Sequence, residues 1–417
     1  MKNPNDLFRL IKSLLPTEKR YFKIYSDLQS GPKSYLVVFK ILEKQKQFSR
    51  EKLLNELIKQ EIVSNKNEDK FRAILSYTRT RILKALRGMA AKKNNELTIQ
   101  SHLQNAEILF AKGLIGQSNY EISQAKKIAR KYDLTLYRQR INRLELDLVQ
   151  QYSNQKTTEK IEELYGVANE LVELVHIENT YAKISHELFV YYRNEGRQKP
   201  NTERLSKIAE QFNSDIFNLA AAQKSFHTHY LYQLILAYFR LVSNEVVNAF
   251  DKYKAVIDIW QQNEKFIIAY PERYRTLMNN YLNLCLSLGK FDQSFFSYLK
   301  LLEEQKTSSI AQQAFKFQDV YFLKLRYALN APELATCPAL ITEIQTKLKR
   351  YRIFIPSSRK IAFYNNIISY YILKEEYQEA AEWTAGLEFN IAKTEQRSDL
   401  QARLKTFNLI FEYENYP

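Results

Sequence analysis

A recurring pattern constrains the fold of this chain more than any other feature. From about residue 99 onward, a bulky residue is followed three positions later by a small or apolar one, just after a polar turn. The starts, some of them weak, fall at residues 120, 158, 202, 246, 291, 336, 377 and 416, which gives spacings of 38 to 45 residues. Self-similarity at such a period is the signature of stacked structural repeats. The clearest instances are Tyr120…Ser123, Val246…Ala249, Phe291…Ser294 and Tyr377…Ala380.

Each repeat unit is predicted to be a pair of helices. In the unit 274–304, the first helix carries apolar residues at helical spacing, Gly289 follows as the turn, and Phe291 opens the second helix. The unit 364–389 has the same layout around a polar turn at 374–376. The 417 residues include only 8 Gly and 9 Pro, which argues against a many-stranded β fold and against glycine-rich phosphate loops.

These units resemble tetratricopeptide repeats. The resemblance rests on the short turn, on Phe291 and Tyr377 at the start of the second helix, and on Ser294 and Ala380 where the two helices would pack closely. It implies a right-handed α-solenoid over residues 96–417 whose concave groove binds a protein or peptide segment. The units are longer than the roughly 34 residues of the family, so we expect longer helices or longer loops such as 193–201.

The end of the sequence resembles the first helix of a further unit, with Tyr416 at the position of Phe291 and Tyr377. A solenoid needs a terminal element that covers its last apolar face. Two interpretations therefore stay open. The lone helix is the cap, or the chain is a fragment that lacks the last helix and stops at Pro417 before it.

Positive charge is concentrated in residues 1–95, which we call the head. It contains 22 Lys or Arg and 9 Asp or Glu, whereas the whole chain carries 62 and 46. The charge imbalance indicates a separate unit with a different surface. Five helices are predicted in it, at 5–14, 17–28, 33–46, 49–60 and 67–90. Ser49 is expected to cap the fourth helix, and Asn65 or Asn67 the fifth.

Residues 71–95 contain seven Lys or Arg and no Asp or Glu. Phe71, Ile74, Leu75, Thr78 and Ile82 fall on one arc of the predicted helix, so the remaining circumference is basic. A second basic cluster, interleaved with Tyr21 and Phe22, lies on the second helix. The candidate contacts to a nucleic acid or an acidic protein are Arg72, Arg79, Arg81, Lys84, Arg87, Lys92, Lys93, Lys19, Arg20 and Lys23.

Three interpretations of the basic stretch stay open. Arg and Lys can neutralise phosphates while Tyr stacks on bases, as in nucleic-acid binding. The same face could bind an acidic protein segment or another part of this chain. It could also be an indifferent solvated surface, since Lys is abundant throughout the sequence.

The aromatic run 225–240 adds two candidate groove residues, Tyr232 and Phe239, which lie off the main apolar stripe of their helix and could anchor a bound peptide. Packing in the core is the alternative. His227 and His229 are two residues apart on a helix, so their side chains diverge and cannot readily share a metal ion. No catalytic motif, metal site or cofactor motif is found.

Cys285 and Cys337 belong to no paired spacing and are interpreted as reduced core residues. The N-terminus lacks the features of a signal peptide, and no stretch approaches about 18 apolar residues, so we expect a cytoplasmic protein without membrane contact. Together, these features predict an all-α protein and a non-enzymatic scaffold or adaptor. The alternative is a nucleic-acid-associated regulator whose basic residues 67–95 bind DNA or RNA phosphates.

Overall fold

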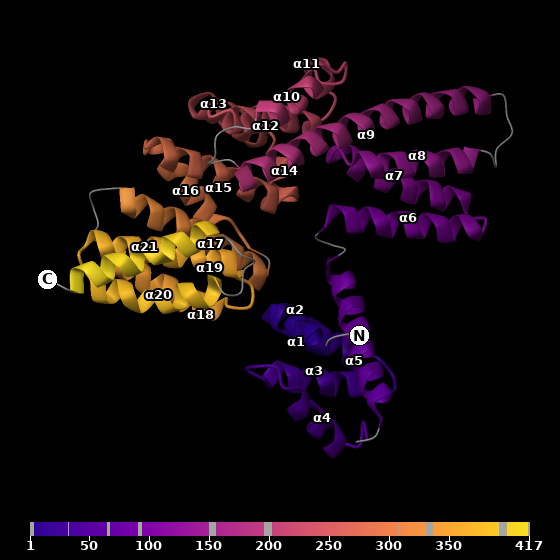
Figure 1. Ribbon diagram of the computed structural model, residues 1–417. Helices are drawn as coiled ribbons and strands as arrows, with labels where there is room; N and C mark the ends of the chain where they lie inside the picture. Colours follow the sequence, from indigo (N-terminus) through magenta and orange to yellow (C-terminus); the bar gives the residue numbers. More distant parts are fainter. Residues whose placement is uncertain are drawn as a thin grey trace. The chain divides into compact units, whose positions relative to one another are not determined.

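The computed structural model describes residues 4–31, 33–64, 67–90, 94–149, 156–195, 202–307, 309–330, 337–391 and 398–415. Within these residues the chain forms 21 α-helices and one short 3₁₀ helix, with no β-strand, and neighbouring helices pack in pairs (Figure 1). The all-α prediction is confirmed. In the same residues, every helix is too short or too polar to cross a membrane.

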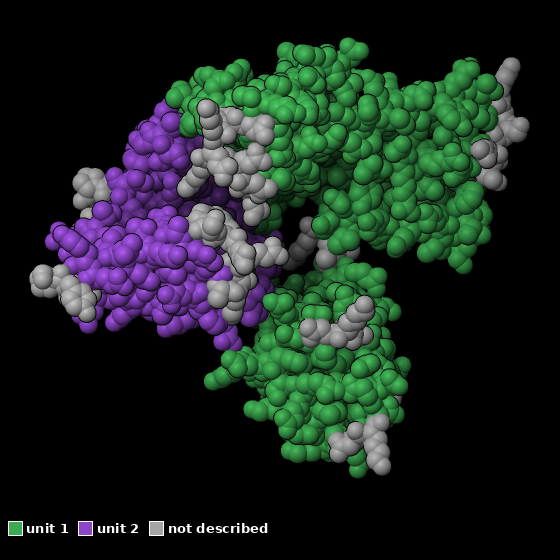
Figure 2. Space-filling view, viewed as in Figure 1, with its two compact units in different colours: residues 1–274 green, residues 275–417 purple. Residues whose placement is uncertain are grey.

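The chain divides into two compact units, residues 1–274 and 275–417, coloured green and purple in Figure 2. The division falls inside the helix that begins at Pro271. The predicted boundary between residues 95 and 96 is a different one, and it stays a prediction.

Five helices of the head lie close to their predicted positions. Their buried residues form one apolar cluster built from residues 7–86, with Phe22, Phe39 and Phe71 fully enclosed. The stripe predicted on the fifth helix is part of this cluster. The bounds are α1 (Pro4–Ser13), α2 (Pro16–Asp27), α3 (Ser34–Lys44), α4 (Arg50–Lys59) and α5 (Glu68–Ala90).

Side-chain caps fix the starts of two head helices. The hydroxyl of Ser49 accepts a hydrogen bond from the Lys52 N–H at 3.2 Å, which confirms the predicted cap of α4. The Asn67 side-chain oxygen accepts from the Lys70 N–H at 2.8 Å and caps α5. Such bonds satisfy N–H groups that have no partner inside the helix. Asn65, the other candidate, lies outside the described residues.

The rest of the first unit continues in adjacent pairs: α6 packs on α7, α7 on α8, α8 on α9, and α12 on both α9 and α13. The bounds are α6 (Asn95–Ala111), α7 (Ile115–Lys131), α8 (Thr135–Val149), α9 (Lys156–Glu195), α10 (Thr202–Glu210), the 3₁₀ helix η1 (Gln211–Asn213), α11 (Leu219–Ala222), α12 (Phe226–Val242), α13 (Val246–Gln261) and α14 (Glu264–Ala269).

The second unit has the same style of packing, and α21 rests on α20. Both cysteines are buried and unbridged. The helices of this region are α15 (Pro271–Leu288), α16 (Gln293–Glu304), α17 (Ile310–Asn330), α18 (Cys337–Arg350), α19 (Ser357–Leu373), α20 (Tyr377–Ile391) and α21 (Ser398–Asn415). Tyr416 and Pro417, named in the two interpretations of the chain end, lie outside the described residues.

A buried ion triad ties three helices of the second unit together. Asp319 of α17 is 6% exposed and pairs with Arg275 of α15 and, at 3.5 Å, with Arg359 of α19. A buried carboxylate is tolerated when cationic partners replace the lost hydration. The triad therefore links the first helices of three successive pairs.

The turns between paired helices share one backbone conformation. At Gly113, Asn244, Gly289 and Glu375, the chain adopts a positive φ of 73°, 62°, 64° and 59°. The N–H of the following residue then donates to a carbonyl five residues back, as from Lys290 to Cys285 at 2.9 Å. This is the hydrogen bond of a Schellman helix end. The predicted turn at Gly289 is thereby confirmed.

Two expectations from the repeat pattern are wrong. Ala380 is fully buried, as predicted, but Ser294 is exposed. The helix α16 starts at Gln293 and not at Phe291 as predicted, and its first buried residue is Phe295. In the first clear unit, α7 begins at Ile115, so Tyr120 lies in its interior and is 61% exposed. The close approach there is made by Ser118, whose hydroxyl donates to the Ala106 carbonyl at 2.9 Å.

The regular pairing is interrupted at α9. This helix runs without a break for 40 residues, through the region that the pattern starts at 158 and 202 would assign to two helices. The sequence indicates no stop there, since Gly166 has a helical neighbourhood and no proline intervenes. The units are longer than tetratricopeptide repeats, and longer helices were one expected reason. In this region the extra length belongs to one long helix, α9.

Candidate functional site

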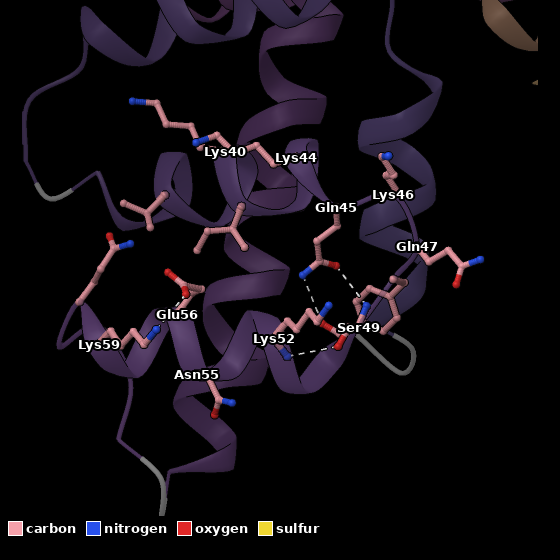
Figure 3. A pocket seen from close by; sticks show the side chains of 14 residues that line it. Lys40, Lys44, Gln45, Lys46, Gln47, Ser49, Lys52, Asn55, Glu56 and Lys59 are labelled. Carbon is pink, nitrogen blue, oxygen red and sulfur yellow. Dashed lines mark hydrogen bonds and ion pairs between the residues drawn. The ribbon is translucent and has the colours of Figure 1, made fainter.

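A groove between α3 and α4 of the head gathers lysine side chains (Figure 3). Its volume is ≈ 1320 Å³. Lysines from α3, from the connecting loop and from α4 surround it, and the half-buried Val37, Ile41 and Phe48 form its apolar part. We call this the lysine groove and define it by Lys40, Lys44, Lys46, Lys52 and Lys59.

Helical spacing explains why these lysines share a groove. Lys40 and Lys44 are four residues apart, and Lys52 and Lys59 are seven apart, so each pair lies on one face of its helix. The buried residues of α3 and α4, such as Phe39, lie in the head core. Packing those apolar faces inward leaves the lysines at the rim.

The connection between α3 and α4 is held by Gln45. Its side-chain nitrogen donates to the Ser49 carbonyl at 3.3 Å, and its side-chain oxygen accepts from the Ser49 N–H at 3.1 Å. Ser49 in turn caps α4. These bonds connect the loop that carries Lys46 to the first turn of α4, where Lys52 lies (Figure 3).

The groove has an excess of positive charge. Glu56 is the one carboxylate in its lining, and it pairs with Lys59 at 3.3 Å. Lys40, Lys44, Lys46 and Lys52 make no ion pair with any described residue. Four such ammonium groups around one hollow raise the local concentration of anions.

The predicted basic helix α5 does not act as one uniform surface. Arg72 pairs with Glu68 at 3.2 Å, one turn earlier, so its charge is partly neutralised. Arg79, Lys84 and Arg87 are exposed and have no ion pair within the described residues. The remaining candidates, Lys92 and Lys93, lie outside the part of the chain that the structure describes.

Arg81 has a different environment from its neighbours on α5. Its guanidinium lies 5.7, 5.2 and 5.9 Å from the ring centroids of Tyr25, Tyr35 and Tyr77. Its Nε is buried and has no hydrogen-bond partner in the described residues. Cation–π contacts of this kind hold a guanidinium in place. Arg81 therefore organises tyrosine rings and is not displayed to solvent as the other α5 cations are.

The cluster predicted on α2 surrounds a carboxylate of α3. Lys23 pairs with Glu43 at 2.8 Å, and Lys19 approaches the same carboxylate at 3.9 Å. Arg20 is exposed and has no such partner among the described residues. These residues line a second hollow of ≈ 650 Å³ in the head.

Tyr232 and Phe239, the predicted groove anchors, are half-buried against other rings of their own unit. Tyr232 packs on Phe217 at a centroid distance of 4.8 Å, and Phe239 meets Phe212 edge-on at 5.0 Å. The segment that follows α10 supplies both covering rings. The described contacts of these two residues are thus those of side chains packed within the unit.

Sequence reasoning missed the lysine groove. The signal was present as the i, i+4 pair Lys40 and Lys44 and in the total charge of the head. Charge density along a single helix is highest in residues 71–95, whereas the lysine groove forms only when α3 and α4 pack together, which charge density along one helix does not indicate. For metals, the described residues contain no group of three or more His, Cys, Asp or Glu that could hold an ion.

No protein-family model, curated protein or solved structure matches this chain. The likeness to tetratricopeptide repeats consequently rests on the residues and helix pairs described above.

Proposed function

We propose that this chain is a non-enzymatic binding protein whose lysine groove grips the phosphate backbone of a nucleic acid. One observation carries the proposal: four lysines without ion pairs among the described residues line a single groove. Lysine neutralises phosphates as a point charge and carries little base information. The groove would therefore supply affinity and orientation more than sequence specificity.

The distribution of the other cations favours a long polyanion over a small one. Arg20 on α2 and Arg79, Lys84 and Arg87 on α5 are further exposed charges without ion pairs in the described residues. A single small anion would be satisfied by one local cluster. A nucleic acid presents phosphates along its whole length and can use charges on several elements.

The helix pairs support a second role as a protein scaffold. We propose that residues 96–417 form a right-handed, tetratricopeptide-like solenoid that presents a surface to a protein or peptide segment. The shared turn geometry at Gly113, Asn244, Gly289 and Glu375 favours this. Cross-linking of the purified complex would test it, since a partner cross-linked only to residues 1–95 would contradict a scaffold role.

The first role is tested by charge reversal in the groove. The variant Lys40→Glu, Lys44→Glu, Lys52→Glu should bind a fluorescent duplex of about 20 base pairs at least ~100-fold more weakly than the natural sequence. The slope of log affinity against log salt should also become shallower by about three, roughly one for each lost phosphate contact. Fluorescence anisotropy over a salt series measures both quantities.

A matched control separates local from overall charge. The exposed Lys112, Lys252 and Lys254 lie outside the head, and their reversal to Glu changes the net charge by the same amount. This control should keep most of the affinity and the full salt slope. Equal affinities and equal slopes for the groove variant and the natural protein would contradict the proposal.

A further inference from the structure

Tyrosines on α2 and α5 of the head are linked by contacts: Tyr21 lies beside Tyr25, and the rings of Tyr25 and Tyr77 both contact Arg81. Tyr77 is 49% exposed and Tyr21 is 37% exposed, although each belongs to a helix whose other face is in the core. Tyr25 lies beside them, half-buried. We call Tyr21, Tyr25 and Tyr77 the tyrosine platform. None of these three tyrosines lines the lysine groove.

On the side that faces the head core, rings of the platform contact Arg81 and Tyr35. The Arg81 guanidinium contacts the rings of Tyr25 and Tyr77, and the buried Tyr35 meets Tyr77 edge-on at a centroid distance of 5.6 Å. Tyr21 lies nearly parallel to Tyr25, with an interplanar angle of 19° and centroids 6.4 Å apart. Rings fixed on one side and open on the other lose little conformational entropy when a planar group stacks on them.

Two cations lie close to the platform along α2 and α5, and neither forms an ion pair within the described residues. Arg20 precedes Tyr21 on α2, and Lys84 lies two helical turns after Tyr77 on α5; both are exposed. A Cβ added at Gly88 would lie 3.5 Å from the Tyr21 hydroxyl, so the Tyr21 side chain reaches across to α5. Aromatic faces beside cations are the combination that single-stranded nucleic acids require.

We infer that the tyrosine platform binds single-stranded nucleic acid, with unpaired bases stacked on Tyr21 and Tyr77 and phosphates near Arg20 and Lys84. This inference rests on the proposed function of the head. A duplex hides its base faces, so only unpaired bases can use exposed rings. The exposed Ile24 and Leu28 continue along α2 from Tyr21 and would also suit a protein segment, which the experiment distinguishes.

The experiment compares two double variants of the full chain. Tyr21→Leu with Tyr77→Leu removes stacking but keeps apolar bulk, whereas Tyr21→Phe with Tyr77→Phe keeps the rings. The probes are fluorescent oligothymidylate and oligouridylate of about 20 nucleotides, an abasic oligomer with the same number of phosphates, a duplex, and an oligoglutamate peptide. The Leu variant should bind both base-bearing strands more weakly, by roughly 5- to 150-fold for each ring lost. The Phe variant should bind like the natural protein, and the abasic oligomer should bind all three proteins equally.

The outcomes separate this inference from the proposed function. Suppose that the Leu variant binds single strands as tightly as the natural protein, while charge reversal in the lysine groove still weakens binding. The inference that bases stack on the tyrosine platform is then wrong, and the proposed function of the lysine groove is retained. If the natural protein binds none of the oligonucleotides, both are wrong. If an oligoglutamate peptide binds in a tyrosine-dependent way and oligonucleotides do not, the platform binds acidic protein.

Discussion

His227, in the first turn of α12, is surrounded by aromatic rings. Tyr270 and Phe226 lie at centroid distances of 5.6 Å, and Phe266 lies at 5.8 Å. Burial lowers the pKa of His227 to about 4, with the positive charge of Arg273 adding to the effect and Asp133 opposing it. His227, which the sequence analysis judged an unsuitable metal ligand together with His229, is therefore a neutral side chain within a cluster of aromatic rings.

This depressed pKa makes stability depend on pH. Between about pH 6.5 and about 4, the unfolded chain takes up a proton on His227 while the folded chain does not, so the free energy of unfolding falls as the pH falls. The loss should reach up to about 3 kcal/mol at the lower limit. Urea unfolding of the natural protein and of His227→Phe, followed across this range, measures the difference.

The variant cannot titrate at this position, so its stability should fall less steeply with acid. Glu178, whose pKa is raised by burial, is unchanged in both proteins, and its opposite contribution cancels in the comparison. Parallel stability curves for the two proteins would show that residue 227 does not titrate in this way.

At the scale of the element, the helix turns depend on backbone conformation more than on side-chain contact. Gly289 has a φ of +64°, and no heavy atom lies within 4 Å of the point where a Cβ would stand, so a side chain there would meet open space. Glu375 occupies the equivalent position with a φ of +59°. A residue with a Cβ is strained in this conformation, whereas glycine is not.

Exchanging the residue types should therefore change stability in opposite directions. Gly289→Ala should lower the free energy of unfolding of the second unit by about 1 kcal/mol, and Glu375→Gly should raise it by about 0.5–1 kcal/mol. Both residues belong to residues 275–417, so chemical denaturation monitored on the same transition compares them directly. A change of the same sign in both variants would contradict this account.

At the scale of the whole molecule, the head has an apolar core of its own. Its buried cluster is built from residues of α1–α5, and no residue beyond Ala85 belongs to the buried set described there. A segment with its own core can fold independently. Residues 1–95, produced alone, should therefore be helical by circular dichroism and unfold in one cooperative transition.

The isolated head should also show the proposed salt-dependent binding of nucleic acid, because the lysine groove and the tyrosine platform both lie within it. A fragment that unfolds gradually, without a sigmoidal transition, would show that the head needs the remaining helices. In that case the boundary of the first unit at residue 274 would describe its folding better than the predicted boundary at residue 95.

The local features of this protein can be predicted from its sequence alone. The all-α fold, the five helices of the head, the cap at Ser49 and the turn at Gly289 follow from apolar spacing, capping residues and glycine, each of which acts within a few positions along the chain. The same local rules could not place Ser294, which depends on where α16 begins.

The environment of each charged side chain, in contrast, depends on the packing of the helices. Arg72, Arg79 and Arg81 are nearly equivalent in sequence, yet one pairs with Glu68, one is exposed and one is enclosed by tyrosine rings. The lysine groove likewise joins α3 to α4, and the tyrosine platform joins α2 to α5. A side chain's electrostatic environment is set by whichever element packs beside it, and that neighbour is chosen by burial of apolar faces far apart in the sequence.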